Sequence, residues 1–255
     1  MLLIKKLIRY PFNLIGLQII KIKDLNKQYD RFNLYLKKVL YYYNYYLTSK
    51  EKLEPAEYLQ FLEMKYSGPV FFSPNIHTFG SATGGDRMNE FFHCYSDVYA
   101  RYLEPIRKSN RKLIILEIGI LNGTGLAIWD EYFVNKKIYG FDYDLRNFEQ
   151  NKSKLLELGA FLKKLPTLKF YDQFADNSKT LEETFGSQKL DVVIDDAYHS
   201  DESIINTFDE LQKYLSESFV YFIEDNRTAW KKLRTKYPQY NFDYNDNELT
   251  VVTKK

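Results

Sequence analysis

The stretch LEIGILNGTGLAIWDEYFVNKKIYGFDYD, residues 116–144, decides the fold. It overlaps an apolar run, LIILEI (113–118), whose length and lack of polar alternation indicate a buried parallel strand. A glycine-rich turn follows, then a helical segment after Gly125, and then a second apolar strand, 137–141, which ends in Asp142. Strand, glycine turn, helix and strand in this order form a βαβ unit, in which the turn lies where ligands bind.

The rest of the chain continues this alternation. Helices are predicted over 146–162, near 178–185 and over 201–215 (capped by Ser200), and strands over 168–171, 190–194 and 219–223. Two extended runs, 240–244 and 249–253, flank the turn residues Asn245, Asp246 and Asn247 and predict a hairpin. The sequence therefore predicts an α/β protein with a doubly wound, mostly parallel sheet and a C-terminal antiparallel hairpin.

The amino-terminal residues 1–66 are predicted to form a helical extension. Their first 21 residues are apolar but interrupted by basic side chains, which is too broken for a spanning helix of about 20 apolar residues. A secretory cleavage site is also lacking. Two roles stay open for residues 1–25: packing on the protein body or on a sister subunit of a homo-oligomer, and peripheral contact with an anionic membrane.

After this extension, glycine and proline residues become frequent and interrupt the helical pattern. They mark residues 67–110 as a loop or lid that leads into a helix. The predicted division is therefore a helical extension (1–66), a lid with its lead-in helix (67–110) and a ligand-binding core (111–255).

Composition narrows the class of protein. Of the 255 residues, 45% are hydrophobic and 27% are charged, which is typical of a globular protein. The 36 Lys and Arg barely exceed the 34 Asp and Glu, so no nucleic-acid partner is expected. Cys94 is the single cysteine, which excludes an intramolecular disulfide and a thiolate zinc cage and indicates a reducing, cytoplasmic setting.

The glycine turn has an unusual spacing, G-x-x-x-G-x-G, in place of the dinucleotide fingerprint G-x-G-x-x-G. Glu117 stands two residues before Gly119, where its charge disfavours a pyrophosphate and favours a cationic ligand. Asp142 ends the second strand 25 residues later, where a carboxylate accepts the hydroxyls of a ribose. A ligand with a ribose and a positive centre but no phosphate is S-adenosyl-L-methionine.

On these residues the chain resembles the class I S-adenosylmethionine-dependent methyltransferases, and among them the metal-dependent sugar O-methyltransferases of macrolide antibiotic pathways. The resemblance covers about residues 75–230 and implies a Rossmann-like, seven-stranded sheet. It implies a cofactor site in which Glu117 faces the methionine amino end, Gly119 and Gly123 line the cofactor, Asp142 holds the ribose, and Asp172 and Gln173 lie near the adenine. A solvated loop is the alternative interpretation of Asp172 and Gln173.

Acidic residues follow the next two predicted strands. DDAYH (195–199) follows the strand 190–194, and ED (224–225) follows the strand 219–223. Neighbouring strands lie about 4.8 Å apart, so the carboxylates at their ends converge and repel one another unless a cation lies between them. Oxygen ligands favour Mg²⁺, Mn²⁺ or Ca²⁺ over zinc. An alternative role for Asp195 is to cap the following helix.

The family resemblance assigns roles to these acids. Its Asp-x-x-His and Glu-Asp motifs match Asp196, His199, Glu224 and Asp225. It implies that Asp196, Glu224 and Asp225 hold the metal, and that His199, beside Asp196, is the catalytic base. An imidazole takes up protons near neutral pH and can deprotonate a hydroxyl that a metal polarises; a satisfied structural histidine is the alternative. Relatives carry Gly-Ser where residues 197–198 are Ala-Tyr, so the acceptor does not follow from the resemblance.

Three functions are compatible with these patterns. The first is a divalent-metal-assisted O-methyltransferase that acts on a sugar hydroxyl, carried by a nucleotide or by a bacterial surface (capsule) polysaccharide. The second keeps the fold and the cofactor but methylates a catechol-like or other small molecule. The third is a membrane-surface or scaffolding protein that retains the methyltransferase fold and uses its basic, apolar start. The first two place the protein in the cytoplasm, and the third adds a membrane-peripheral location.

Overall fold

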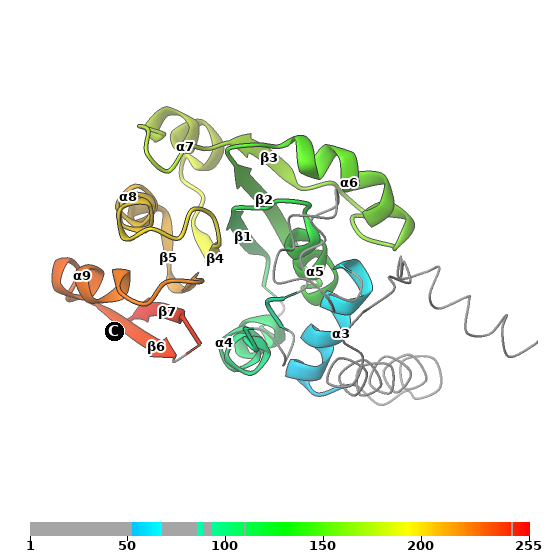
Figure 1. Cartoon of the computed structure of the whole chain (residues 1–255), viewed down its shortest axis with the longest axis horizontal. Coiled ribbons are helices and arrows are strands. Elements are labelled where there is room, and N and C mark those ends of the chain that lie inside the picture. The colour runs from blue at the N-terminus through cyan, green and yellow to red at the C-terminus, as the bar shows by residue number, and fades with distance from the viewer. Residues whose placement is uncertain (1–52, 68–85, 89–92, 110, 246) are drawn as a thin grey trace, which may run out of the picture. The chain divides into compact units, whose positions relative to one another are not determined.

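The structure, a computed structural model, describes residues 53–67, 86–88, 93–109, 111–245 and 247–255 (Figure 1). The predictions for residues 1–25 and for most of the lid lie outside these residues. The chain divides into two compact units, residues 1–100 and 101–255. Within the described residues, no helix is long and apolar enough to span a membrane.

In the first unit, helix α3 (Pro55–Ser67) begins in the predicted helical extension and ends one residue beyond it. It carries a buried acid, Glu63, whose Oε1 accepts a hydrogen bond of 2.8 Å from the backbone N–H of Met88. Helix α4 (Ser96–Lys108) begins in this unit and continues into the second. Glu63 thus ties the helix to a short segment 25 residues further along the chain.

The second unit is built on a seven-stranded sheet. Its strands are β1 (Leu113–Ile118), β2 (Lys136–Asp142), β3 (Thr167–Phe170), β4 (Leu190–Asp195), β5 (Leu215–Ile223), β6 (Tyr240–Asn245) and β7 (Leu249–Lys254). Their order is β3-β2-β1-β4-β5-β7-β6. The first five strands run parallel, and β7 is antiparallel to both β5 and β6. The predicted fold class is confirmed, and the strand order reverses between β1 and β4, where ligands bind in such sheets.

Helices cover both faces of this sheet (Figure 1). Helices α5 (Thr124–Tyr132) and α6 (Arg146–Glu157) lie on one face, and α7 (Ser178–Phe185), α8 (Asp201–Leu211) and α9 (Ala229–Lys236) lie on the other. The predicted cap of α8 is confirmed, because the Ser200 side chain accepts a hydrogen bond from the Ser203 N–H. Between the sheet and helices α7, α8 and α9 lies a continuous core of aromatic and aliphatic side chains. Among them are Phe141, Tyr171, Phe185, Val193, Phe208, Tyr214, Tyr221 and Leu233. Each such side chain contributes about 1.5–3 kcal/mol, which fixes the strand ends that carry the site.

Several elements differ from the sequence prediction. Helix α6 ends at Glu157 rather than at 162, because the chain adopts left-handed conformations at Gly159 and Phe161. Helix α8 ends at Leu211 rather than at 215, where a short 3₁₀ turn follows it. Strand β5 starts at Leu215, four residues before the predicted start, and its pairing with β4 shifts register near its beginning. Helix α9 was not predicted, because it is short and buries only Ala229 and Leu233, which leaves a weak apolar pattern.

Candidate active site

The glycine turn between β1 and α5 packs tightly on its surroundings. Gly119 has φ 82°, and a Cβ added to it would lie 2.1 Å from the carbonyl oxygen of Asp196. Gly123 has φ 76°, and a Cβ there would lie 2.3 Å from the ring of Phe148 on α6. Only glycine combines these conformations with such close approaches. The turn is therefore pressed between the end of β4 and α6.

Asp142, at the end of β2, organises the same turn. Its Oδ2 accepts hydrogen bonds from the backbone N–H groups of Ile120 (2.8 Å) and Leu121 (3.0 Å), and its Oδ1 accepts one from Asp144 (2.8 Å). A carboxylate has about four lone-pair sites, so three amide bonds leave room for a ligand hydroxyl. Asp142 is thus placed both to shape the turn and to accept a further bond.

Glu117 is buried at the end of β1, 1% exposed. Its Oε2 accepts a hydrogen bond of 3.0 Å from the indole N–H of Trp129, which is itself buried in α5. Trp129 was not predicted to support the site. Its position in the helix after the glycine turn could have indicated this role. A buried indole N–H needs a hydrogen-bond acceptor, and Glu117 is the acid that ends the preceding strand. This bond orients the Glu117 carboxylate.

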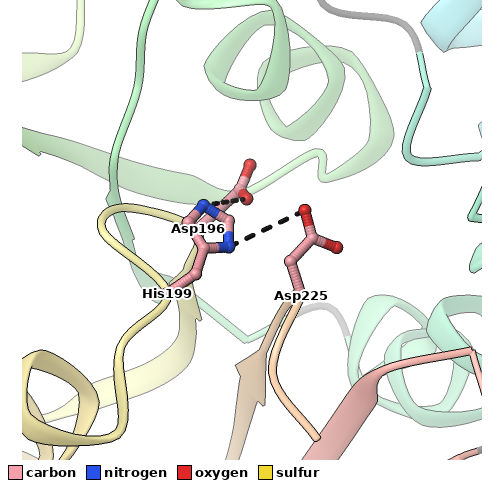
Figure 2. Close-up of side chains that lie close together, drawn as sticks. All are labelled: Asp196, His199 and Asp225. Atoms are coloured by element: carbon pink, nitrogen blue, oxygen red, sulfur yellow. Dashed lines mark ion pairs between the residues drawn. The ribbon is translucent and has the colours of Figure 1, made fainter. Parts of the chain in front are cut away.

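His199 lies between two carboxylates at the carboxyl ends of β4 and β5 (Figure 2). Its Nε2 is 3.7 Å from Asp196 Oδ1 and its Nδ1 is 3.7 Å from Asp225 Oδ2. One potential ligand atom from each of the three residues lies within 4.8 Å of the others, so the group could hold a metal ion. The separations exceed hydrogen-bond length, and the buried Nδ1 has no hydrogen-bond partner among the described residues. Buried polar atoms are normally paired with a protein group, an ordered water, a ligand or an ion.

Two residues of this group, one in the loop after β4 and one in the loop after β5, have uncommon backbone conformations. His199 has φ 62° and Asp225 has φ 53°, in the left-handed region that non-glycine residues rarely adopt. Such conformations cost about 1–3 kcal/mol each and persist only where neighbouring contacts impose them. Strain of this kind often marks functional sites, and here it directs the two side chains toward one another (Figure 2).

The other predicted acids have different surroundings. Glu224, the residue before Asp225, is buried, and it is not part of the three-residue group. Asp195 points into the protein, where it accepts hydrogen bonds from Gln173 Nε2 (2.9 Å) and from the Tyr221 hydroxyl (3.2 Å). Burial raises the pKa of Asp195 to about 7. Ser200 caps α8, so Asp195 is not the cap of that helix; its carboxylate instead accepts hydrogen bonds from buried side chains.

Gln173, after β3, lies beneath the loop that carries His199. Its Nε2 donates to Asp195 and to Thr207 Oγ1 (2.8 Å), while its Oε1 accepts the backbone N–H of Tyr198 at 3.0 Å. The side chain is only 6% exposed, which overturns the interpretation of Gln173 as part of a solvated loop. The neighbouring Asp172 accepts the N–H of Phe174 at 2.9 Å, a local turn at the same strand end.

An exposed aromatic pair adjoins the three-residue group. The rings of Phe174 and Tyr198 meet edge to face with centroids 5.2 Å apart. Both rings face solvent, with Tyr198 69% exposed. The loops that follow β3 and β4 thus present an exposed aromatic pair, one ring of which belongs to the residue before His199.

This fold is the one shared by S-adenosylmethionine-dependent methyltransferases. The MycE methyltransferase of the mycinamycin pathway, solved with Mg and S-adenosylhomocysteine, superposes with a TM-score of 0.54 at 17% identity, over 81% of this chain and 56% of that one. The same enzyme with Mg, S-adenosylhomocysteine and mycinamycin VI gives a TM-score of 0.51 at 18% identity, over 73% of this chain and 64% of that one.

Two curated sequences similar to this chain are named O-methyltransferases. A tetracenomycin-pathway enzyme of Streptomyces olivaceus, 8-demethyl-8-alpha-L-rhamnosyl tetracenomycin-C 2'-O-methyltransferase, is 25% identical over 176 residues, 66% of this chain and 40% of that protein. Mycinamicin VI 2''-O-methyltransferase of Micromonospora griseorubida is 26% identical over 147 residues, 55% of this chain and 33% of that protein. No family model matches the chain. The chain spans at most two fifths of these relatives, and its predicted resemblance to sugar O-methyltransferases is confirmed.

Proposed function

We propose that this protein transfers the methyl group of S-adenosyl-L-methionine to a sugar hydroxyl, assisted by a divalent cation. The observation that carries the proposal is the position of His199 between Asp196 and Asp225, at the strand ends beside the glycine turn. Both curated relatives are named for methylating a sugar oxygen, which supports the choice of acceptor.

The cofactor would occupy the crevice at the glycine turn. Glu117 would face the methionine amino group, with Gly119 and Gly123 along the cofactor and Asp142 at the ribose. The segment of Asp172 and Gln173 would lie near the adenine. The buried Glu117 and the free lone-pair site of Asp142 support these roles, since a cation and a hydroxyl are the groups that they could bind.

A divalent cation fits the donors at the strand ends. Two carboxylates, those of Asp196 and Asp225, converge there, and carboxylates are the ligands that Mg²⁺ and Mn²⁺ prefer. The proposed ligands are Asp196, Asp225 and Glu224, the last from its position beside Asp225. The MycE structures hold Mg, which supports a metal as part of the proposed function. Such an ion lowers the pKa of a hydroxyl bound to it.

His199 would act as the general base. Its Nδ1 is buried and faces Asp225, so Nε2, beside Asp196, is the nitrogen that would accept the hydroxyl proton. The acceptor oxygen would attack the methyl carbon as the carbon–sulfur bond breaks, and S-adenosylhomocysteine would leave. Asp225 would orient the imidazole and stabilise its protonated form.

The acceptor we propose is a sugar carried by a nucleotide or by a surface polysaccharide. The bulky, exposed Tyr198 stands where the relatives carry a small side chain, which supports an acceptor different from theirs. The working partners are therefore S-adenosyl-L-methionine, Mg²⁺ or Mn²⁺, and a small sugar substrate.

Mass spectrometry of a panel of nucleotide sugars and catechols tests this proposal. The protein is incubated with S-adenosyl-L-methionine and Mg²⁺ or EDTA, and His199→Ala serves as the matched control. We expect a methyl mass gain that requires Mg²⁺ and is lost in the variant. Gain that survives EDTA would remove the metal from the mechanism. Gain on catechols but on no sugar would replace the acceptor class.

A further inference from the structure

Asn226, the residue after Asp225, is buried between the two loops of the site. Its Nδ2 donates to the backbone carbonyl oxygen of His199 (2.9 Å) and to Oδ1 of Asp201 at the start of α8 (3.1 Å). Its Oδ1 accepts the backbone N–H groups of Thr228 (2.8 Å) and Ala229 (2.7 Å) at the start of α9. Both N–H donors and both lone pairs of the carboxamide are therefore used.

These contacts join the two halves of the candidate site. Asp196 and His199 come from the loop between β4 and α8, whereas Asp225 comes from the loop between β5 and α9. The bond from Asn226 to His199 connects one loop to the other at a residue with a left-handed backbone. A fixed carbonyl limits rotation of the peptide that follows His199, and so limits the direction of the imidazole.

We propose that Asn226 is a positioning residue that keeps the His199 imidazole between Asp196 and Asp225. Its effect on methyl transfer rests on the function proposed above, whereas its effect on His199 does not. Asp201 also accepts the Thr228 hydroxyl at 2.7 Å and pairs with Lys232 at 2.7 Å, contacts that do not involve His199. The start of α8 is thus held to the start of α9, on either side of Asn226.

The substitution Asn226→Asp separates the two tasks of this side chain. An Asp carboxylate still caps α9 through its oxygens, but it has no N–H to donate to His199 and it repels Asp201. Thr228→Ala is the matched control, because it removes a different bond to Asp201 and leaves the bond to His199 intact. Asn226→Ser is a second variant, whose hydroxyl can cap the helix but is too short to bridge the loops.

Nitrogen-15 NMR of labelled histidine side chains measures the effect without metal, cofactor or acceptor. The chain has three histidines, so the spectrum of His199→Gln assigns the His199 signals. We expect Asn226→Asp and Asn226→Ser to shift or broaden only these signals, and Thr228→Ala to leave them in place. Unchanged His199 signals in both Asn226 variants, or equal shifts in Thr228→Ala, would overturn the proposal.

Steady-state kinetics then relate the position of His199 to turnover. Misplacement of a catalytic group by about 1 Å can lower the rate up to 100-fold, so we expect kcat to fall at least tenfold in Asn226→Asp. KM for S-adenosyl-L-methionine should stay within about twofold of wild type, because none of the hydrogen bonds of the Asn226 side chain goes to the glycine turn. A rise in KM with unchanged kcat would contradict a positioning role. A wild-type protein without activity would refute the proposed function, while the NMR result would still decide the role of Asn226.

Discussion

Gly119 lies directly against the main chain of Asp196. A Cβ on Gly119 would come within 2.1 Å of the Asp196 carbonyl oxygen, and the Asp196 N–H donates to the carbonyl of Ile118 at 2.9 Å. The proposed cofactor turn and the proposed metal-binding loop are therefore in backbone contact where the strand order reverses. A side chain added at Gly119 should therefore displace the main chain of Asp196.

Substitution of Gly119 by Ala tests this contact. We expect the free energy of unfolding to fall by about 2 kcal/mol or more, because the added Cβ both strains a left-handed backbone and collides with Asp196. S-adenosylhomocysteine binding should be lost in calorimetry. Gly186→Ala is the control: Gly186 also has positive φ (50°), but its nearest neighbour would be 3.8 Å away. Equal losses in the two variants would argue against the close contact.

Asp196→Asn should weaken metal binding and turnover together. The substitution removes one of the converging negative charges, so we expect the Mn²⁺ dissociation constant to rise at least tenfold, about 1.4 kcal/mol. Calorimetric titration of the purified protein with Mn²⁺ measures this change. Asp191→Asn alters an acid at the opposite end of β4, where Asp191 pairs with Arg111, and should leave the constant unchanged. Wild-type affinity in Asp196→Asn would exclude this carboxylate as a ligand.

His199→Ala should leave cofactor binding nearly intact while it lowers turnover. Loss of a general base costs about 100-fold or more, so kcat should fall by that factor. S-adenosylhomocysteine affinity should stay near the wild-type value, because no atom of the glycine turn is altered. His93→Ala is the comparison variant, since His93 lies 3.9 Å from Asp86 in the first unit. Turnover of His199→Ala at the wild-type level would leave the histidine as a structural residue.

The sequence could predict the sheet and the acids of the site because both depend on short-range patterns. Strands such as β1 and β4 are continuous apolar runs, and parallel strands necessarily bring their terminal acids, Asp196 and Asp225, to one edge. The hydrogen bonds through which two amide side chains support the site were beyond such reasoning. Gln173 and Asn226 make their key bonds to residues 25 and 27 positions away, and no local pattern specifies such partners.

The pH dependence of stability should report on Glu63. Burial raises the pKa of Glu63 to about 8, so the folded protein retains a proton that the unfolded chain releases near pH 4.5. The stabilising contribution of the protonated carboxyl is complete below pH 4.5 and is lost as the pH rises through 8. We expect wild type to lose about 1.4 kcal/mol per pH unit across this window relative to Glu63→Gln, measured by urea denaturation. Glu57→Gln removes another acid of α3 and should keep the wild-type slope. Parallel pH profiles for wild type and Glu63→Gln would show that Glu63 is ionised in the fold.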